Sequence, residues 1–147
     1  MVAQAFHANL ADLDTTAQVS LGSIYELDNK RYKYVKFSGT TAINVGDVLC
    51  YVSSDQNLQT VDGANTAYGA GVAINAVGTG TVLYGWIQIT GIAVMSQTAA
   101  GSPAFGDYLT TSGATAPNAT KSTTSNMNVI GSMVNVAGKV INLDCEN

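Results

Sequence analysis

Charged residues are scarce in this sequence. Asp, Glu, Lys and Arg make up 11% of its 147 residues, where typical soluble domains have about 25%. Residues 63–106 contain none of these four types and no histidine. Solubility must therefore rest on Ser, Thr, Asn and Gln side chains. The formal net charge of -4 argues against nucleic acid as a partner, because its phosphates would repel an acidic chain.

Long apolar runs and an early basic residue are missing too. No run approaches the 18 or so consecutive apolar residues of a membrane-spanning helix, and residues 1–29 contain no Lys or Arg. We therefore expect no membrane association, no secretory signal with a basic start, and a protein made in the cytoplasm. In that compartment Cys50 and Cys145 are expected to be buried, reduced thiols, and a disulfide between them is the minor alternative.

Patterns that carry catalysis or bind metal are absent as well. The one histidine, His7, lies in an N-terminal stretch without clear periodicity, and no spacing of His, Cys, Asp and Glu matches a zinc or calcium site. Asp47 and Asp107 form the most regular carboxylate pair, but each follows a glycine, where Asp commonly caps its own turn. The glycine-rich stretch GAGVAINAVGTG lacks the Lys-Ser/Thr ending of a phosphate-binding loop. We expect no catalytic site, cofactor or metal.

What the sequence has in abundance is short, β-rich runs bounded by turn residues. Two runs around Asp28-Asn29 predict a β-hairpin that lies at a sheet edge or against a partner. This pattern predicts an all-β fold, a β-sandwich or small β-barrel, in a single domain over residues 21–147 after a poorly structured arm at 1–20. The polar stretch 111–126 is expected to be a surface loop. Further strands are expected at 46–52, 70–75, 81–90, 91–95, 106–111, 128–136 and 139–143.

A faint internal repeat emerges at an offset of 60 residues. Each copy would have a Gly-Asp turn that starts a strand and a second strand bounded by glycines. The two units would span about 38–96 and 98–147. Duplication and chance similarity between glycine-punctuated strands both stay open. The matched pairs are Gly46 with Gly106, Asp47 with Asp107, Leu49 with Leu109, Gly71 with Gly131, Asn75 with Asn135, and Gly78 with Gly138.

Two stretches are candidate interaction surfaces. The first is basic and aromatic, and we interpret it as a solvated edge strand, a small nucleic-acid surface, or a patch that binds an acidic neighbour. The second is the strand that holds the only tryptophan, whose uncharged polar face is predicted to lie against a subunit. The candidate interface residues are Lys30, Arg31, Lys33 and Lys36 in the first stretch, and Trp86, Gln88 and Thr90 in the second.

The succession LGSIYELDNKRYKYVKFSG, INVGDVLCYV, YGAGVAINAV and YGWIQITGIAVM resembles the decoration, or cement, proteins of tailed-bacteriophage heads. The resemblance covers about Leu21 to Met95. It implies a non-enzymatic all-β virion protein, commonly a homotrimer, made in the host cytoplasm. Such a protein binds the major capsid protein on the outer capsid surface and bridges capsomers. The resemblance is carried by scaffold positions only, so it identifies no binding residue in this chain.

A carbohydrate- or receptor-binding β-domain of a phage fibre or lectin type is the alternative function. Trp86 or exposed tyrosines would then stack on sugar rings, with Asn, Asp and Gln as hydrogen-bonding partners. The position of Trp86 separates the two hypotheses. A solvated tryptophan face favours a ligand platform, whereas a buried face favours the core or a subunit interface.

Overall fold

The computed structural model describes residues 9–52, 59–63, 68–111, 119–122 and 129–146, and this part of the chain is all-β without a helix. It has ten strands in one continuous sheet. The predicted all-β class is confirmed. The strands are β1 (Ile24–Leu27), β2 (Lys30–Phe37), β3 (Val48–Tyr51), β4 (Thr60–Asp62), β5 (Gly69–Ala73), β6 (Leu83–Val94), β7 (Tyr108–Thr111), β8 (Ala119–Lys121), β9 (Val129–Asn135) and β10 (Val140–Asp144).

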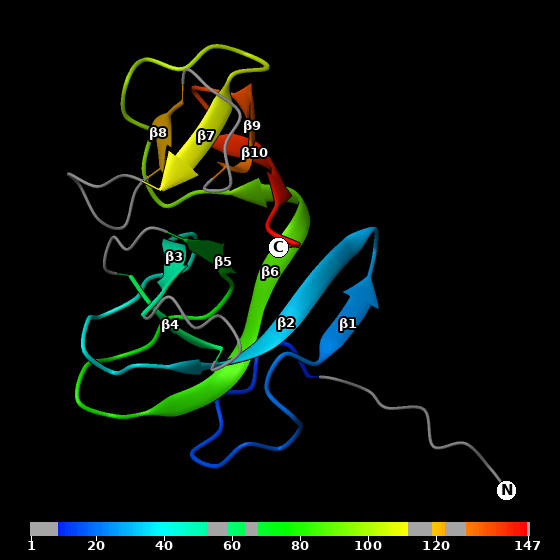
Figure 1. Cartoon of the computed structure of the whole chain (residues 1–147), viewed down its shortest axis with the longest axis vertical. Coiled ribbons are helices and arrows are strands. Elements are labelled where there is room, and N and C mark those ends of the chain that lie inside the picture. The colour runs from blue at the N-terminus through cyan, green and yellow to red at the C-terminus, as the bar shows by residue number, and fades with distance from the viewer. Residues whose placement is uncertain (1–8, 53–58, 64–67, 112–118, 123–128, 147) are drawn as a thin grey trace, which may run out of the picture.

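The N-terminal half of the sheet closes into a small barrel (Figure 1). Strands follow the order β2-β4-β3-β5-β6, and pairing of β2 with β6 completes the ring. The β2–β4 pair is parallel and the others are antiparallel. The C-terminal half continues from β6 in the order β10-β9-β7-β8. There a single parallel bridge between Ala100 and Thr120 lies where the first half has its parallel β2–β4 pair.

The predicted hairpin is present as β1 and β2. Asp28 and Asn29 have φ values of 51° and 59°, the left-handed conformation of both central residues in a two-residue hairpin turn. Strand β1 is the sheet edge, whereas β2 pairs with β1, β4 and β6. The aromatic strand is therefore internal to the sheet, and only its partner β1 lies at the edge.

Strand β6 is one strand, although the sequence predicts two, at 81–90 and 91–95. Gly91 separates the predicted strands and has φ +88°, yet it pairs with Leu143 in register with its neighbours. A Cβ atom there would lie 2.8 Å from the carbonyl oxygen of Asn29. Glycine therefore lets the hairpin turn approach β6 without ending the strand, and β6 serves both halves of the molecule.

Strands β4 and β8 were not predicted from the sequence. Each has three residues, too few to show the alternation that identifies a strand. Strand β8 lies inside the stretch 111–126 that was expected to be surface loop, and Ala119 is completely buried. That part of the prediction is wrong, while residues 112–118 and 123–126 lie outside the described residues.

The two halves share a set of contacts at the offset of 60 residues. Leu49 pairs with Gly71 as Leu109 pairs with Gly131, with a register shift after each leucine, and both glycines have φ +154°. These shared contacts are what an internal duplication would produce. Matching hydrogen bonds are Gly46 N to Ala73 O with Gly106 N to Met133 O, Asp47 N to Asn44 O with Asp107 N to Ala104 O, and Ala73 N to Asp47 O with Met133 N to Asp107 O.

The described part of the N-terminal segment, from residue 9 on, packs against the first barrel. Asp14 and Tyr84 exchange two backbone hydrogen bonds of 2.8 Å. Leu10 and Val19 pack against buried aromatic residues on the outside of the first barrel, and Leu13 packs against the main core. Residues 1–8, with His7, lie outside the described residues.

Candidate interaction surface

Trp86 lies on the outer face of β6, where the chain itself covers it. Its side chain is 4% exposed. The centroid of its ring is 5.1 Å from that of Tyr34 in an edge-on arrangement and 6.0 Å from that of Tyr25. The Tyr34 hydroxyl donates a hydrogen bond to Asp14 Oδ2 at 2.9 Å and accepts one from the Gln18 amide at 3.2 Å. Trp86 is therefore buried between the sheet, β1 and the N-terminal segment.

The Gln88 side chain also makes its hydrogen bonds within its own chain. It is 5% exposed, and its Nε2 donates hydrogen bonds of 3.0 Å to the carbonyl oxygens of Thr90 and Ile92. Trp86 and Gln88 were predicted to meet another subunit, and the structure instead places both inside the monomer. The lack of charge around them reflects intramolecular burial, because a buried unpaired charge is costly.

The basic cluster does not form one surface. Successive side chains of a strand point to opposite faces, so Lys33 faces the barrel interior, where it is 8% exposed. Its Nζ donates a hydrogen bond to the Tyr51 hydroxyl at 3.0 Å. Lys36 is half-buried and pairs with Tyr84 and Thr60 at the far end of β2. The four basic residues therefore do not share one surface, as the patch interpretation requires.

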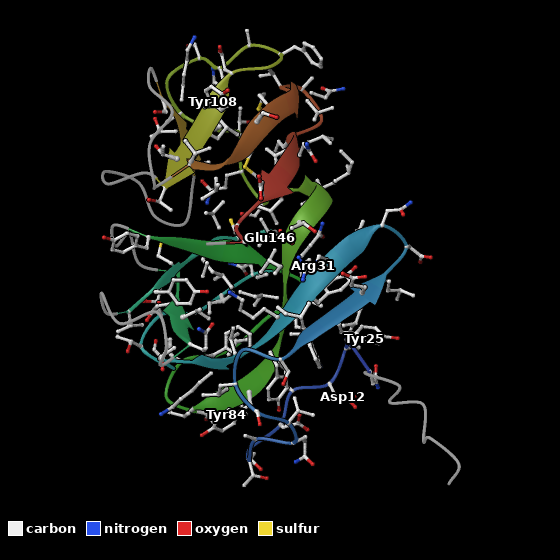
Figure 2. The ribbon with its side chains drawn as sticks, turned by 45° about the vertical axis from the view of Figure 1, so that its right-hand side comes forward. Asp12, Tyr25, Arg31, Tyr84, Tyr108 and Glu146 are labelled. Atoms are coloured by element: carbon white, nitrogen blue, oxygen red, sulfur yellow. The ribbon has the colours of Figure 1, made fainter. Side chains whose placement is uncertain are left out.

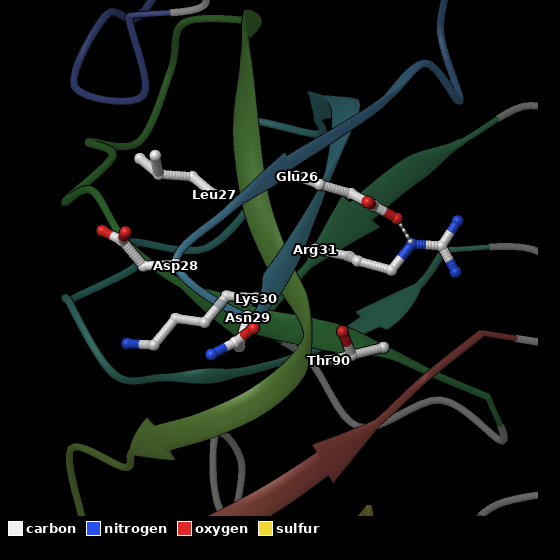
Figure 3. A pocket seen from close by; sticks show the side chains of 7 residues that line it. All are labelled: Glu26, Leu27, Asp28, Asn29, Lys30, Arg31 and Thr90. Carbon is white, nitrogen blue, oxygen red and sulfur yellow. Dashed lines mark ion pairs between the residues drawn. The ribbon is translucent and has the colours of Figure 1, made fainter.

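Lys30, Arg31 and Thr90 do come together. They line a hollow of about 420 Å3 at the end of the β1–β2 hairpin, as Figure 3 shows. Arg31 forms ion pairs with Glu26, at 3.0 Å from its Nε, and with Glu146 near the C-terminus. Arg31 and Glu146 thus connect the first-half hairpin to the end of the second half (Figure 2). Glu26, Leu27, Asp28, Asn29, Lys30, Arg31 and Thr90 line the hollow.

An exposed apolar surface begins next to this hollow and was missed in the sequence. From Thr90 onward the outward residues of β6 are progressively uncovered: Ile92 is 48% exposed and Val94 58%. Tyr108 of β7, visible in Figure 2, is 49% exposed. We define the open strip as six uncharged outward residues of four neighbouring strands, next to which the exposed Asp144 is a charged outward residue of β10. The open strip consists of Ile92, Val94, Tyr108, Ser132, Val140 and Asn142.

Four residues of the open strip match the covered aromatic face of the first half. Ile92 pairs with Asn142 as Tyr32 pairs with Gln88. Val94 likewise pairs with Val140, and Tyr34 pairs with Trp86 in the same arrangement. In the first half this face is buried under β1 and the N-terminal segment. In the second half it is left open.

A signal for the open strip was present in the sequence. Alternation in β6 puts Ala93 and Met95 inside, where both are buried, and Ile92 and Val94 outside. Apolar residues at both odd and even positions predict a strand that is apolar on both faces. The absence of a covering segment for the second half was not visible, because it depends on tertiary structure.

Cys50 and Cys145 are buried and are not joined by a disulfide bond. Cys145 is 4% exposed, and its Sγ donates to the Ile130 carbonyl oxygen at 3.6 Å. Burial raises the pKa of the Cys145 thiol to about 12, and the nearby Asp144 carboxylate adds to the increase. A neutral, buried thiol of this kind is a poor nucleophile.

Among the described residues, no group of three or more His, Cys, Asp or Glu side chains is arranged to hold a metal ion. Nor does that part of the chain contain a helix long and apolar enough to cross a membrane. Comparison of the chain with protein-family models, curated proteins and solved structures finds no match.

Proposed function

We propose that this chain is a non-enzymatic structural protein of a tailed-phage virion, which binds the outer surface of the head and stabilises its capsomers. Its partner is the major capsid protein, and the chain is made in the host cytoplasm. The observation that carries the proposal is the open strip, with Ile92, Val94 and Tyr108 between 48% and 58% exposed. Large hydrophobic side chains exposed together on one face of a small domain are typical of an interaction site.

The surroundings of the open strip support an interface of this type. Its residues carry no charge, and charged groups such as Glu26, Lys30 and Arg31 lie around the adjoining hollow. An apolar centre beside a charged, solvated rim is the usual organisation of a protein–protein interface. The resemblance of about Leu21 to Met95 to decoration proteins supplies the kind of partner, which the open strip alone does not.

Co-sedimentation with empty heads of the phage that encodes this chain tests the proposal. The chain should pellet with heads and saturate at a fixed ratio to the major capsid protein, and Val94→Glu should reduce that binding by about tenfold or more, because it places a charge in the interface. Val52→Glu is the matched control, since Val52 is 46% exposed on the first half. Wild-type chain that stays in the supernatant at all head concentrations would refute the function.

A carbohydrate-binding role is the second candidate, and one observation favours it. Tyr108 lines a shallow hollow of about 130 Å3 together with Asn142 and Asp144, which combines an exposed aromatic ring with hydrogen-bonding groups. Trp86 can no longer serve as the stacking platform, because it is buried. Glycan-array binding that Tyr108→Ala abolishes, combined with no binding to heads, would establish this alternative in place of the first.

A further inference from the structure

We propose that Val45 and Phe105 are two equivalent anchors, each of which inserts into the same apolar pocket on a different copy of one repeated partner subunit. The partner is the major capsid protein, so this inference rests on the proposed function, and the experiments below separate the two. Three features of the structure favour it.

The first feature is the exposure of these two side chains. Phe105 is 81% exposed and Val45 is 60% exposed, the two highest values among the large hydrophobic residues that the structure describes. They are also related by the offset of 60 residues that relates the two halves. Single exposed apolar side chains are normal on a protein surface. That the two most exposed ones hold the same position of the repeat points to a shared role.

The second feature is the turn that carries each side chain. Val45 and Phe105 both stand second in a four-residue turn, and the glycine that follows has φ +88° in the first turn and +85° in the second, as the third position of a type II turn requires. The amide of the last residue, Asp47 or Asp107, donates to the carbonyl oxygen of the first residue at 3.1 Å. Its Oδ2 accepts a hydrogen bond from the amide of that first residue, at 2.7 Å for Asp47 and 2.6 Å for Asp107. Both tips are therefore supported in the same way.

The third feature is that the rest of the molecule holds each turn in place. The Ser96 hydroxyl donates a hydrogen bond to Asp47 Oδ1 at 2.5 Å. In the second half, Lys121 Nζ forms an ion pair with Asp107 Oδ2 at 2.8 Å. A side chain on a turn that is already held loses less conformational freedom when it binds. Both tips are thus prepared to act as anchors.

Two equal supports with apolar tips fit a partner that presents one apolar pocket more than once. The shell of a phage head does so, because it repeats the same subunit. Binding through both tips raises the affinity by about 10²–10⁴ over binding through one. A pocket that accepts the ring of Phe105 also accepts the smaller Val45, which fills less of it. The tip of the second half is therefore the stronger anchor.

Co-sedimentation with empty heads tests the two anchors. Phe105→Ser and Val45→Ser should each weaken binding by about a hundredfold, the first more than the second, and the double variant should bind more weakly still. Neither residue belongs to the open strip, so these variants leave that surface unchanged. Val82→Ser is the matched control and should bind like the wild type, because Val82 is 42% exposed and lies on neither turn. Far-UV circular dichroism shows whether each variant is folded.

Val45→Phe tests whether the two pockets are the same. It gives the first tip the side chain of the second and should strengthen binding to heads on the order of tenfold. A substitution that merely damages the fold does not raise affinity.

Photo-cross-linking locates the pockets directly. The photoreactive residue p-benzoylphenylalanine, placed at position 45 or at position 105, should cross-link to the same peptide of the major capsid protein. A chain that carries it at both positions should give a product with two capsid subunits. The same residue at position 82 should give neither product.

Each other outcome overturns the inference. Serine variants that bind heads as tightly as the wild type, or a loss at only one of the two positions, would show that the tips are not paired anchors. Weaker binding of Val45→Phe, or cross-links to two different peptides, would show that the pockets are not equivalent. In all of these cases the wild type still pellets with heads, so the proposed function stands. Wild-type chain that never pellets refutes the function and this inference with it.

Discussion

Replacement of Trp86 by alanine tests whether the N-terminal segment and β1 truly bury the outer face of the first half. The Trp86 side chain is 4% exposed, so nearly all of its area is removed from water. A large aromatic side chain buries about 150–250 Å2, which at about 25 cal/mol per Å2 corresponds to roughly 4–6 kcal/mol. Measured aromatic-to-alanine truncations in cores cost about 3–5 kcal/mol. We expect Trp86→Ala to lower the free energy of unfolding by about 4 kcal/mol.

Val140→Ala is the matched control, because Val140 holds the corresponding place in the second half and is only half-buried. Its loss should cost less than about 1 kcal/mol in the monomer. Urea unfolding followed by far-UV circular dichroism measures both variants, since Trp86 is the only tryptophan and its fluorescence is lost with it. A cost below about 1 kcal/mol for Trp86→Ala would refute the proposed burial. In the wild type, Trp86 fluorescence should also resist aqueous quenchers.

Two further predictions concern the core and the backbone. Gly71→Ala and Gly131→Ala should each destabilise by about 2–4 kcal/mol, because a Cβ would collide with the carbonyl oxygens of Gln88 and Asn142, respectively. Thermal unfolding measures both variants, with Gly78→Ala as the control because nothing lies within 4 Å of a Cβ added there. A mild effect at Gly71 with a severe one at Gly131, or the reverse, would contradict equivalent roles of these two glycines in the two halves. Cys145 should resist alkylation at pH 8 in the folded protein and react when unfolded. Because burial raises its pKa from 9.0 to about 12, its contribution to stability is full below pH 9 and is lost between pH 9 and 12, at about 1.4 kcal/mol per pH unit. Urea unfolding at a series of pH values measures this loss, and a free energy of unfolding that stays constant from pH 9 to 12 would contradict it.

Much of the fold follows from local sequence signals. The Asp28-Asn29 turn was predictable because few residue pairs tolerate the left-handed conformation at both central positions. Most strands were predictable for a similar reason, since β-branched and aromatic runs end at glycines. Strand β4 was not, because three residues carry no periodicity, and the continuity of β6 through Gly91 depends on the hairpin turn that packs against it.

The interaction surface was predictable only in part. One part of it was predicted, since the same hollow at the hairpin end is lined by Lys30, Arg31 and Thr90. The position of Lys33 was not predicted, because strand alternation points its side chain into the barrel. Trp86 was correctly singled out as central to the domain, yet its cover comes from residues more than 50 positions away in sequence. The residue pattern of a strand shows whether each of its two faces is apolar. It cannot show which segment covers each face, because that depends on tertiary structure.

The central claim is that the open strip joins this chain to a phage head. Its most direct test is co-sedimentation of the wild type and Val94→Glu with empty heads across a range of chain concentrations. The account predicts saturable binding of the wild type and a loss of about tenfold or more in affinity for Val94→Glu, with Val52→Glu like the wild type. Wild-type chain that never pellets with heads, or a Val94→Glu variant that binds as tightly as the wild type, would contradict it.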